Sequence, residues 1–189
     1  MSTGLKTVAA AAAMSATLAL ASQPAQAISY AISWTGSGGY TMAGTFSYSD
    51  ALIGTGAIDE TQIDSLTIEV FLSGVSQGSW DWLTDGVVGV FNFNFDTTLE
   101  KFLVGGFSGT STGQSWNTDG SGTGCAGSVG FISGNNGQGV CVDGSFVSSI
   151  LTGQSTLTAI RIEVPEPATF GLLGAGLAGL AVMRRRKAA

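Results

Sequence analysis

The sequence of 189 residues contains no histidine, and this absence excludes several classes of enzyme site. Without histidine the chain cannot build a Ser-His-Asp or Cys-His nucleophile pair or a histidine metal site, and it lacks the commonest general base. Charged residues make up only 11% of the chain, with 7 basic and 13 acidic side chains, and there are 2 cysteines and 3 prolines. We therefore expect a protein that is not an enzyme and that holds no cofactor and no metal.

The apolar residues of the chain are concentrated at its two ends. At the N-terminus, Lys6 precedes an apolar, alanine-rich run over residues 8–21, and Ala25-Gln26-Ala27 follows. A positive residue, an apolar run and a site with small residues are, in this order, the features of a secretory signal peptide. We predict a signal peptide over residues 1–27, removed by signal peptidase, with the exported chain beginning at Ile28.

A second apolar run, over residues 170–183, lies close to the C-terminus. At about 1.5 Å per residue this run reaches about 21 to 24 Å, which is short of a hydrocarbon core of about 30 Å. We predict a short membrane helix here, with everything before it outside the cytoplasm, because basic residues beside a membrane segment stay on the cytoplasmic side. The basic residues that follow the run are Arg184, Arg185, Arg186 and Lys187.

Residues 164–189 resemble the PEP-CTERM sorting signal, which occurs on exported proteins of Gram-negative bacteria that make extracellular polysaccharide. The resemblance rests on the triplet Pro165, Glu166 and Pro167, on the short apolar run and on the terminal basic cluster. It implies that exosortase, an integral membrane protease, recognises the triplet and cleaves the tail. The protein would then be anchored transiently before it reaches the cell surface or the extracellular space. A permanent anchor that is never cut is the alternative.

The middle of the chain, residues 28–163, is strongly acidic. Only Lys101 and Arg161 are basic there, and without the two ends the net charge changes from −6 to −10, because the ends carry five basic residues and one acidic residue, Glu166. A domain of this charge repels anionic polymers, nucleic acid included, and suits cations or neutral glycans. We therefore expect no nucleic-acid partner.

The pattern of the middle predicts an all-β domain. Apolar residues alternate with polar ones, as in Tyr30, Ile32 and Trp34, and no segment shows an apolar period of 3.6 residues. We expect an antiparallel β-sandwich or jelly-roll-like domain with glycine-rich loops, and long loops over residues 105–139. The alternating segments are residues 30–34, 66–72, 91–95 and 160–164, and further expected strands are 40–49, 99–104, 129–133, 140–147 and 155–159.

Cys125 and Cys141 are 16 positions apart near the ends of the glycine-rich stretch. In an exported chain two cysteines favour a disulfide bond, which for a loop of this size contributes about 3 kcal/mol. Two thiolates without a histidine or a carboxylate cluster make a poor zinc site. The sequence therefore predicts a structural disulfide.

The segment Ser79-Trp80-Asp81-Trp82 is the candidate glycan contact, because indole rings stack on sugars and a carboxylate accepts hydrogen bonds from hydroxyl groups. Packing of one tryptophan in the core, with the other over a loop, is the alternative. The candidates for a pair of glycosidase carboxylates are Asp59 with Glu60 and Asp81 with Asp85. The alternative is that these acidic residues lie in exposed turns and have no catalytic role.

Two groups of oxygen-bearing side chains are candidates for calcium binding. Asn92, Asn94 and Asp96 alternate along one predicted strand, and Asn117 and Asp119 lie in a glycine-rich loop. The alternatives are an exposed strand face and a solvated turn, since no known calcium-loop pattern surrounds either group.

The sequence as a whole indicates an exported, non-enzymatic cell-surface or extracellular-matrix protein, associated with exopolysaccharide or a biofilm. A glycan- or calcium-binding module is the second hypothesis, and a small glycan-active enzyme is the third. The expected partners are signal peptidase, an exosortase-like membrane protease and extracellular polysaccharide.

Overall fold

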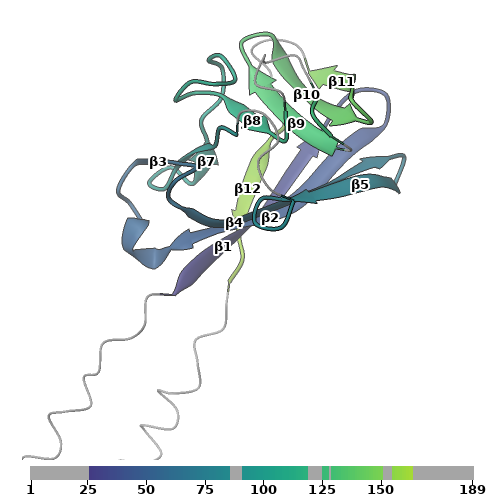
Figure 1. The fold of residues 1–189 in the computed structure, drawn as a ribbon. Coiled ribbons are helices and arrows are strands. Elements are labelled where there is room, and N and C mark those ends of the chain that lie inside the picture. The colour runs from purple at the N-terminus through teal and green to yellow at the C-terminus, as the bar shows by residue number, and fades with distance from the viewer. Residues whose placement is uncertain (1–25, 86–90, 119–124, 128, 151–154, 164–189) are drawn as a thin grey trace, which may run out of the picture.

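The computed structural model describes residues 26–85, 91–118, 125–127, 129–150 and 155–163. Residues 1–25 of the predicted signal peptide (residues 1–27) and the tail from residue 164 lie outside the described residues. The expectation of an all-β, antiparallel domain is confirmed (Figure 1). The elements are β1 (Ala27–Thr35), β2 (Tyr40–Ser49), the 3-10 turn η1 (Asp50–Leu52), β3 (Ala57–Asp59), β4 (Ile63–Leu72), β5 (Val75–Asp81), β6 (Asn94–Asp96), β7 (Lys101–Phe102), β8 (Gln114–Trp116), β9 (Val129–Gly134), β10 (Gly137–Val142), β11 (Ser145–Ile150) and β12 (Thr158–Arg161).

The largest sheet has five strands in the order β12-β1-β2-β4-β5. Its strands alternate as the sequence predicts, because successive side chains of a strand point to opposite faces. One face is apolar and buried, and it carries Tyr30, Ile32 and Trp34 of β1 and Leu66 and Ile68 of β4. On β1 and β2 the opposite face carries small and hydroxyl-bearing side chains.

Two smaller sheets, β11-β10-β9-β8 and β3-β6-β7, lie against the apolar face of the five-stranded sheet. Aromatic rings join the layers: Tyr30 contacts Phe95 at 5.1 Å between ring centroids, and Trp34 contacts Phe131 at 5.6 Å. The edge-to-face geometry of both pairs is the one that aromatic quadrupoles favour. An aromatic core between the layers therefore holds the described domain together.

The two smaller sheets are joined to each other by polar groups. The backbones of Asn92 and Ser115 exchange two hydrogen bonds of 2.9 Å. The buried side chain of Gln114 donates to the carbonyl oxygens of Asn94 and Leu103 and accepts from the backbone N–H of Asn94. Gln114 thus completes a ladder where the backbone alone leaves donors and acceptors unpaired.

Several expected strands differ from those observed. The expected strand 140–147 is two strands, β10 and β11, which are joined by a turn at Asp143 and Gly144. The expected strand 99–104 is reduced to the two residues of β7, and β12 takes in the end of the expected strand 155–159 and the start of the expected strand 160–164. Turns decide these boundaries, and alternation of apolar residues does not mark them.

The disulfide bond between Cys125 and Cys141 is present, with the two Cα atoms 5.4 Å apart. Cys141 lies on β10 and is fully buried, while Cys125 belongs to a short described segment before β9. The bond therefore ties this segment to the centre of the four-stranded sheet.

Candidate functional site

The first candidate glycan residue, Trp80, belongs to the core. It lies on β5 with only 3% of its surface exposed, and its ring contacts Phe91 and Trp82 at centroid distances of 5.8 and 6.4 Å. A buried ring has no free face for a sugar. In this structure Trp80 therefore supports the neighbouring surface and does not present its own ring to a ligand.

Trp82 and Asp81 form the start of the turn that follows β5. Trp82 is half-buried and stacks on Phe91, with ring centroids 4.0 Å apart. One carboxylate oxygen of Asp81 accepts hydrogen bonds from the backbone N–H groups of Leu83 and Thr84, at 2.8 and 3.2 Å. Of the two tryptophans, Trp82 is the one that retains solvent-exposed surface.

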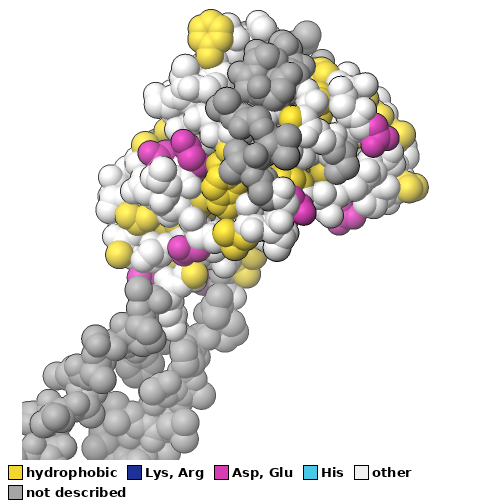
Figure 2. Space-filling view, in the orientation of Figure 1, with side chains coloured by type: hydrophobic (Ala, Val, Ile, Leu, Met, Phe, Trp, Pro, Cys, Tyr) yellow, Lys and Arg dark blue, Asp and Glu magenta, His cyan; other side chains and the backbone are white. Residues whose placement is uncertain are grey.

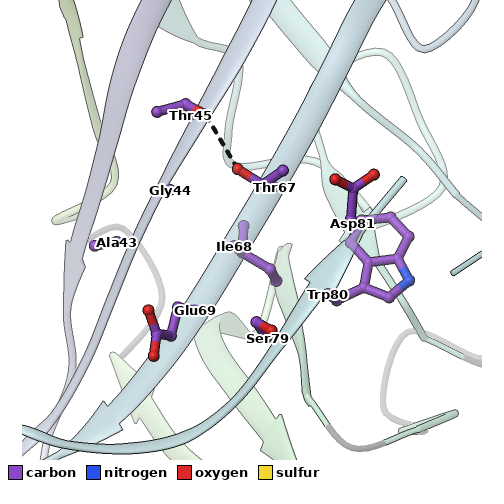
Figure 3. Close-up of a pocket in the computed structure, with 9 residues that line it drawn as sticks. All are labelled: Ala43, Gly44, Thr45, Thr67, Ile68, Glu69, Ser79, Trp80 and Asp81. Atoms are coloured by element: carbon purple, nitrogen blue, oxygen red, sulfur yellow. Dashed lines mark hydrogen bonds between the residues drawn. The ribbon is translucent and has the colours of Figure 1, made fainter. Parts of the chain in front are cut away.

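A hollow on the outer face of the five-stranded sheet adjoins this turn (Figure 3). It has a volume of about 430 Å³ and is formed by β2, β4 and β5. Gly44 is one of its lining residues, and a Cβ atom there would come within 2.1 Å of the carbonyl oxygen of Thr67. The residues around it are Ala43, Thr45, Thr67, Ile68, Glu69, Ser79, Trp80 and Asp81, and of these the side chains of Ile68 and Trp80 are buried in the core.

The two charged side chains that line the hollow are both acidic. Figure 3 shows the carboxylates of Glu69 and Asp81 on opposite sides of the hollow, with Thr67 and Ser79 between them. The hydroxyl groups of Thr45 and Thr67 share a hydrogen bond of 3.0 Å, whereas the carboxylate of Glu69 has no hydrogen bond within the described part of the chain. No lysine or arginine lines the hollow, so its field favours neutral or cationic groups.

Sequence reasoning named Trp80, Asp81 and Ser79 but missed Ala43, Thr45, Thr67 and Glu69. The available signal was the register of the strands. Thr45 pairs with Thr67, and Thr67 pairs with Asp81, so these side chains form one row across the sheet. Strand order is not readable from alternation alone, and the row was therefore not predicted.

Asn92 and Asn94 have a structural role in place of the exposed strand face expected for them. Both are buried, and the amide nitrogen of each lies within hydrogen-bond distance of the carbonyl oxygens of Thr110 and Gly113. The expectation of an exposed face is therefore wrong at these two positions. Asp96 accepts hydrogen bonds from the backbone N–H groups of Thr98 and Leu99 and so closes a turn.

The other candidate calcium residues do not form a cluster within the described ranges. Asn117 is buried and donates its amide to the carbonyl oxygen of Val129, while Asp119 lies outside the described residues. No group of three or more Cys, Asp or Glu side chains with metal-binding geometry occurs in the part of the chain that the structure describes. Calcium binding stays a prediction from the sequence.

The acid pairs serve turns and backbone groups. Asp59 accepts from the backbone N–H and the hydroxyl of Thr61, and Glu60 accepts from the backbone N–H of Phe93. Asp85 accepts from the backbone N–H of Asp81 at 2.6 Å. Each of these carboxylates therefore accepts a hydrogen bond from a backbone N–H group.

The start of β1 and the end of β12 lie at the same end of the domain (Figure 1). The two strands pair antiparallel, and the backbone N–H of Ile162 donates to the carbonyl oxygen of Ser29 at 2.8 Å. Glu100 connects this edge to the interior, because it accepts from the Tyr30 hydroxyl at 2.9 Å and lies 3.8 Å from the Arg161 guanidinium. This pairing of β12 with β1 therefore directly precedes the C-terminal tail in the sequence.

The fold and its ends define an antiparallel, disulfide-linked all-β domain whose last strand leads into a C-terminal tail. Residues 163–187 match the PEP-CTERM protein-sorting motif. This match contains the triplet Pro165, Glu166 and Pro167 and the basic residues 184–187, all of which lie outside the described residues. The chain is therefore similar in its tail to exported substrates of exosortase.

The motif implies export, transient anchoring through the C-terminus and processing by the membrane protease exosortase. No curated protein and no solved structure matches the chain. The described residues contain no helix that is both long and apolar enough to cross a membrane.

Proposed function

We propose that residues 28–163 are the cargo of the sorting tail and act, without catalysis, at the cell surface or in the extracellular matrix, in association with exopolysaccharide. The observation that carries this proposal is the position of the sorting motif, which begins at Glu163, directly after the last paired strand. Removal of the tail would leave every described strand in place. The cargo is thus a complete β-domain before and after processing.

The properties of the domain support this role. Its disulfide suits an oxidising compartment outside the cytoplasm. Its net charge of −10 keeps separate copies apart and in solution. β1 and β2, which present hydroxyl groups on the outer face of the five-stranded sheet, contain no charged residue. These features fit a protein that works among polysaccharides and has no need of a catalytic centre.

The test is fractionation of a host that produces the chain with an epitope tag inserted at the exposed turn of Gly54. We expect the tagged domain at the cell surface or in the medium, at a mass lower than that of the precursor. Replacing Pro165, Glu166 and Pro167 by alanine is expected to retain an uncut form in the membrane fraction. A tagged chain that stays in the cytoplasm contradicts the proposal, and an uncut wild-type chain at the surface supports the permanent anchor.

A glycan-binding module is the second candidate, and the hollow around Gly44 is the observation that favours it. The hollow of about 430 Å³ falls within the range of ligand pockets and combines hydroxyl groups with two carboxylates. Hydroxyl groups and carboxylates match the hydrogen-bonding groups of a neutral sugar. We expect Glu69→Gln to weaken binding to the host polysaccharide at least threefold.

The matched control is Asp143→Asn, which removes the same charge at an exposed turn outside the hollow. Equal weakening by both variants, measured by co-sedimentation with the polysaccharide, would show a general charge effect. Undetectable binding of the wild-type chain would leave the matrix role without a specific glycan site.

A further inference from the structure

Large apolar side chains are exposed at the end of the domain from which the tail leaves. Ile53 is 46% exposed, Leu99 is 61% exposed and Ile162 is 40% exposed. Figure 2 shows hydrophobic side chains on the surface at this end, with acidic side chains between them. Exposed apolar side chains that gather on one part of a surface mark contacts with proteins or membranes.

Hydrogen bonds and an ion pair place these three residues on neighbouring segments. The backbone N–H of Gly54, next to Ile53, donates to the carbonyl oxygen of Thr97 at 3.4 Å, two residues before Leu99. Glu100, next to Leu99, lies 3.8 Å from Arg161, next to Ile162. The turn after β2, the turn after β6 and the end of β12 therefore form one end of the domain, which we call the tail-proximal end.

The length of chain between this end and the apolar run of the sorting motif limits how far apart they lie. Eight residue steps separate Ile162 from Phe170, where the apolar run of the sorting motif begins. Eight steps span at most about 28 Å even when the chain is fully extended. An anchored precursor consequently holds the tail-proximal end within about 28 Å of the start of its membrane segment.

We propose that the tail-proximal end rests on the lipid surface while the tail is anchored, with Ile53, Leu99 and Ile162 entering the interfacial region of the bilayer. This inference rests on the proposed function, because it requires the tail to be in the membrane. A weak contact is sufficient, since the tether keeps the effective concentration of the lipid surface high. Once the tail is cut, the tether is lost and the same contact no longer holds the domain.

The charged groups around the tail-proximal end decide which lipids suit it. Asp50, Asp96, Glu100 and Glu163 carry four negative charges, and Lys101 and Arg161 carry two positive charges. The contact is therefore apolar in origin and is opposed by anionic headgroups. We expect closer contact with vesicles of phosphatidylcholine than with vesicles that also contain phosphatidylglycerol.

The test places an environment-sensitive NBD label at Leu99→Cys in the full chain, purified from membranes of a strain without the exosortase-like protease and reconstituted into phosphatidylcholine vesicles. Val75→Cys is the matched control, because Val75 is 65% exposed but lies at the start of β5, at the opposite end of the five-stranded sheet. Labelling is done without reductant so that the Cys125–Cys141 bond is preserved.

We expect the label at position 99 to show blue-shifted emission and at least twofold quenching by doxyl-labelled lipid, and the label at position 75 to resemble a label in water. Water-like emission without quenching at position 99, in chains that remain bound to the vesicles, overturns the inference and leaves the sorting function intact. Chains that fail to partition into membranes before purification contradict the proposed function itself. Equal quenching at both positions overturns the oriented docking.

Discussion

The side chain of Gln114 pairs with the backbone of Asn94 as a neighbouring strand would. Its amide nitrogen donates to the Asn94 carbonyl oxygen at 2.7 Å, and its amide oxygen accepts from the Asn94 N–H at 3.1 Å. Both residues are buried, so water cannot replace these bonds. A single side chain therefore joins the three-stranded sheet to the four-stranded sheet.

Gln114→Ala should lower the free energy of unfolding by about 2 to 3 kcal/mol, because it removes three hydrogen bonds and takes this partner from the buried N–H of Asn94. The measurement is urea denaturation followed by tryptophan fluorescence. Gln62→Ala is the control, since Gln62 is exposed and makes one bond of 3.3 Å, and we expect a loss below about 0.5 kcal/mol. Equal losses for both variants would show that the pairing contributes nothing specific.

Trp80→Ala should destabilise the domain by about 3 to 5 kcal/mol, which is the usual cost of removing a large buried aromatic ring. Trp82→Ala should cost less, because its ring is only half-buried. Thermal unfolding of the two variants distinguishes them. A glycan-binding experiment should therefore use Trp82→Ala, since loss of binding in Trp80→Ala would report loss of folding.

Gly44→Ala should destabilise the domain by about 1 to 3 kcal/mol, because its Cβ atom would collide with the backbone oxygen of Thr67 and separate β2 from β4. Gly109→Ala is the matched control, since no atom lies within 4 Å of the corresponding Cβ position. Chemical denaturation should show a change below about 0.5 kcal/mol for the control. A stable Gly44→Ala variant would mean that the two strands tolerate a wider spacing.

Reduction of the Cys125–Cys141 bond should lower stability by about 3 kcal/mol, in line with a loop of 16 residues. The measurement compares denaturation midpoints with and without a reductant. The double variant Cys125→Ser, Cys141→Ser should match the reduced protein and should no longer respond to the reductant. A response of the double variant would show that the reductant acts elsewhere.

Stability should fall as the pH rises above about 10, partly because of Tyr30. Burial, together with hydrogen bonds to Tyr48 and Glu100, raises the pKa of the Tyr30 phenol well above its ordinary value near 10. Above that pH the unfolded chain loses the Tyr30 proton while the folded chain keeps it, so the unfolded state is favoured. Below about pH 10 Tyr30 is protonated in both states, and its full contribution to stability is present.

Melting temperatures between pH 8 and pH 11 test this expectation. Tyr30→Phe is expected to be less stable at pH 8, because two hydrogen bonds of the phenol are lost. It should lose less stability than the wild type between pH 10 and pH 11. Parallel curves for the two proteins would contradict the role of Tyr30 in the alkaline decline.

The long strands of the domain were predictable because their side chains alternate between a buried face and an exposed one. This held for residues 30–34 and 66–72, which lie in β1 and β4. It failed for Asn92 and Asn94, because the loop that contains Thr110 and Gly113 covers these two side chains and its backbone carbonyl groups accept hydrogen bonds from their amides. Alternation of apolar and polar residues indicates that one face of a strand is buried. It does not indicate whether the polar face is covered as well.

The candidate site was predictable only in part. The adjacent letters Trp80-Asp81-Trp82 drew attention to the end of β5, yet the hollow depends equally on Thr45 of β2 and Glu69 of β4. These residues come together through strand order and register, which are set by contacts between distant parts of the chain. The burial of Trp80, which removes its ring from ligand contact, has the same origin.

By itself the sequence determined the sorting motif and the class of fold. The sorting motif at residues 163–187 is a continuous segment whose order of residues carries the information, and the all-β class follows from local alternation. Only the tertiary structure decided that Glu69 and Asp81 face one hollow and that Ile53, Leu99 and Ile162 gather beside the tail. Both groupings join residues far apart in the chain, and packing of the sheets, which no local pattern records, brings them together.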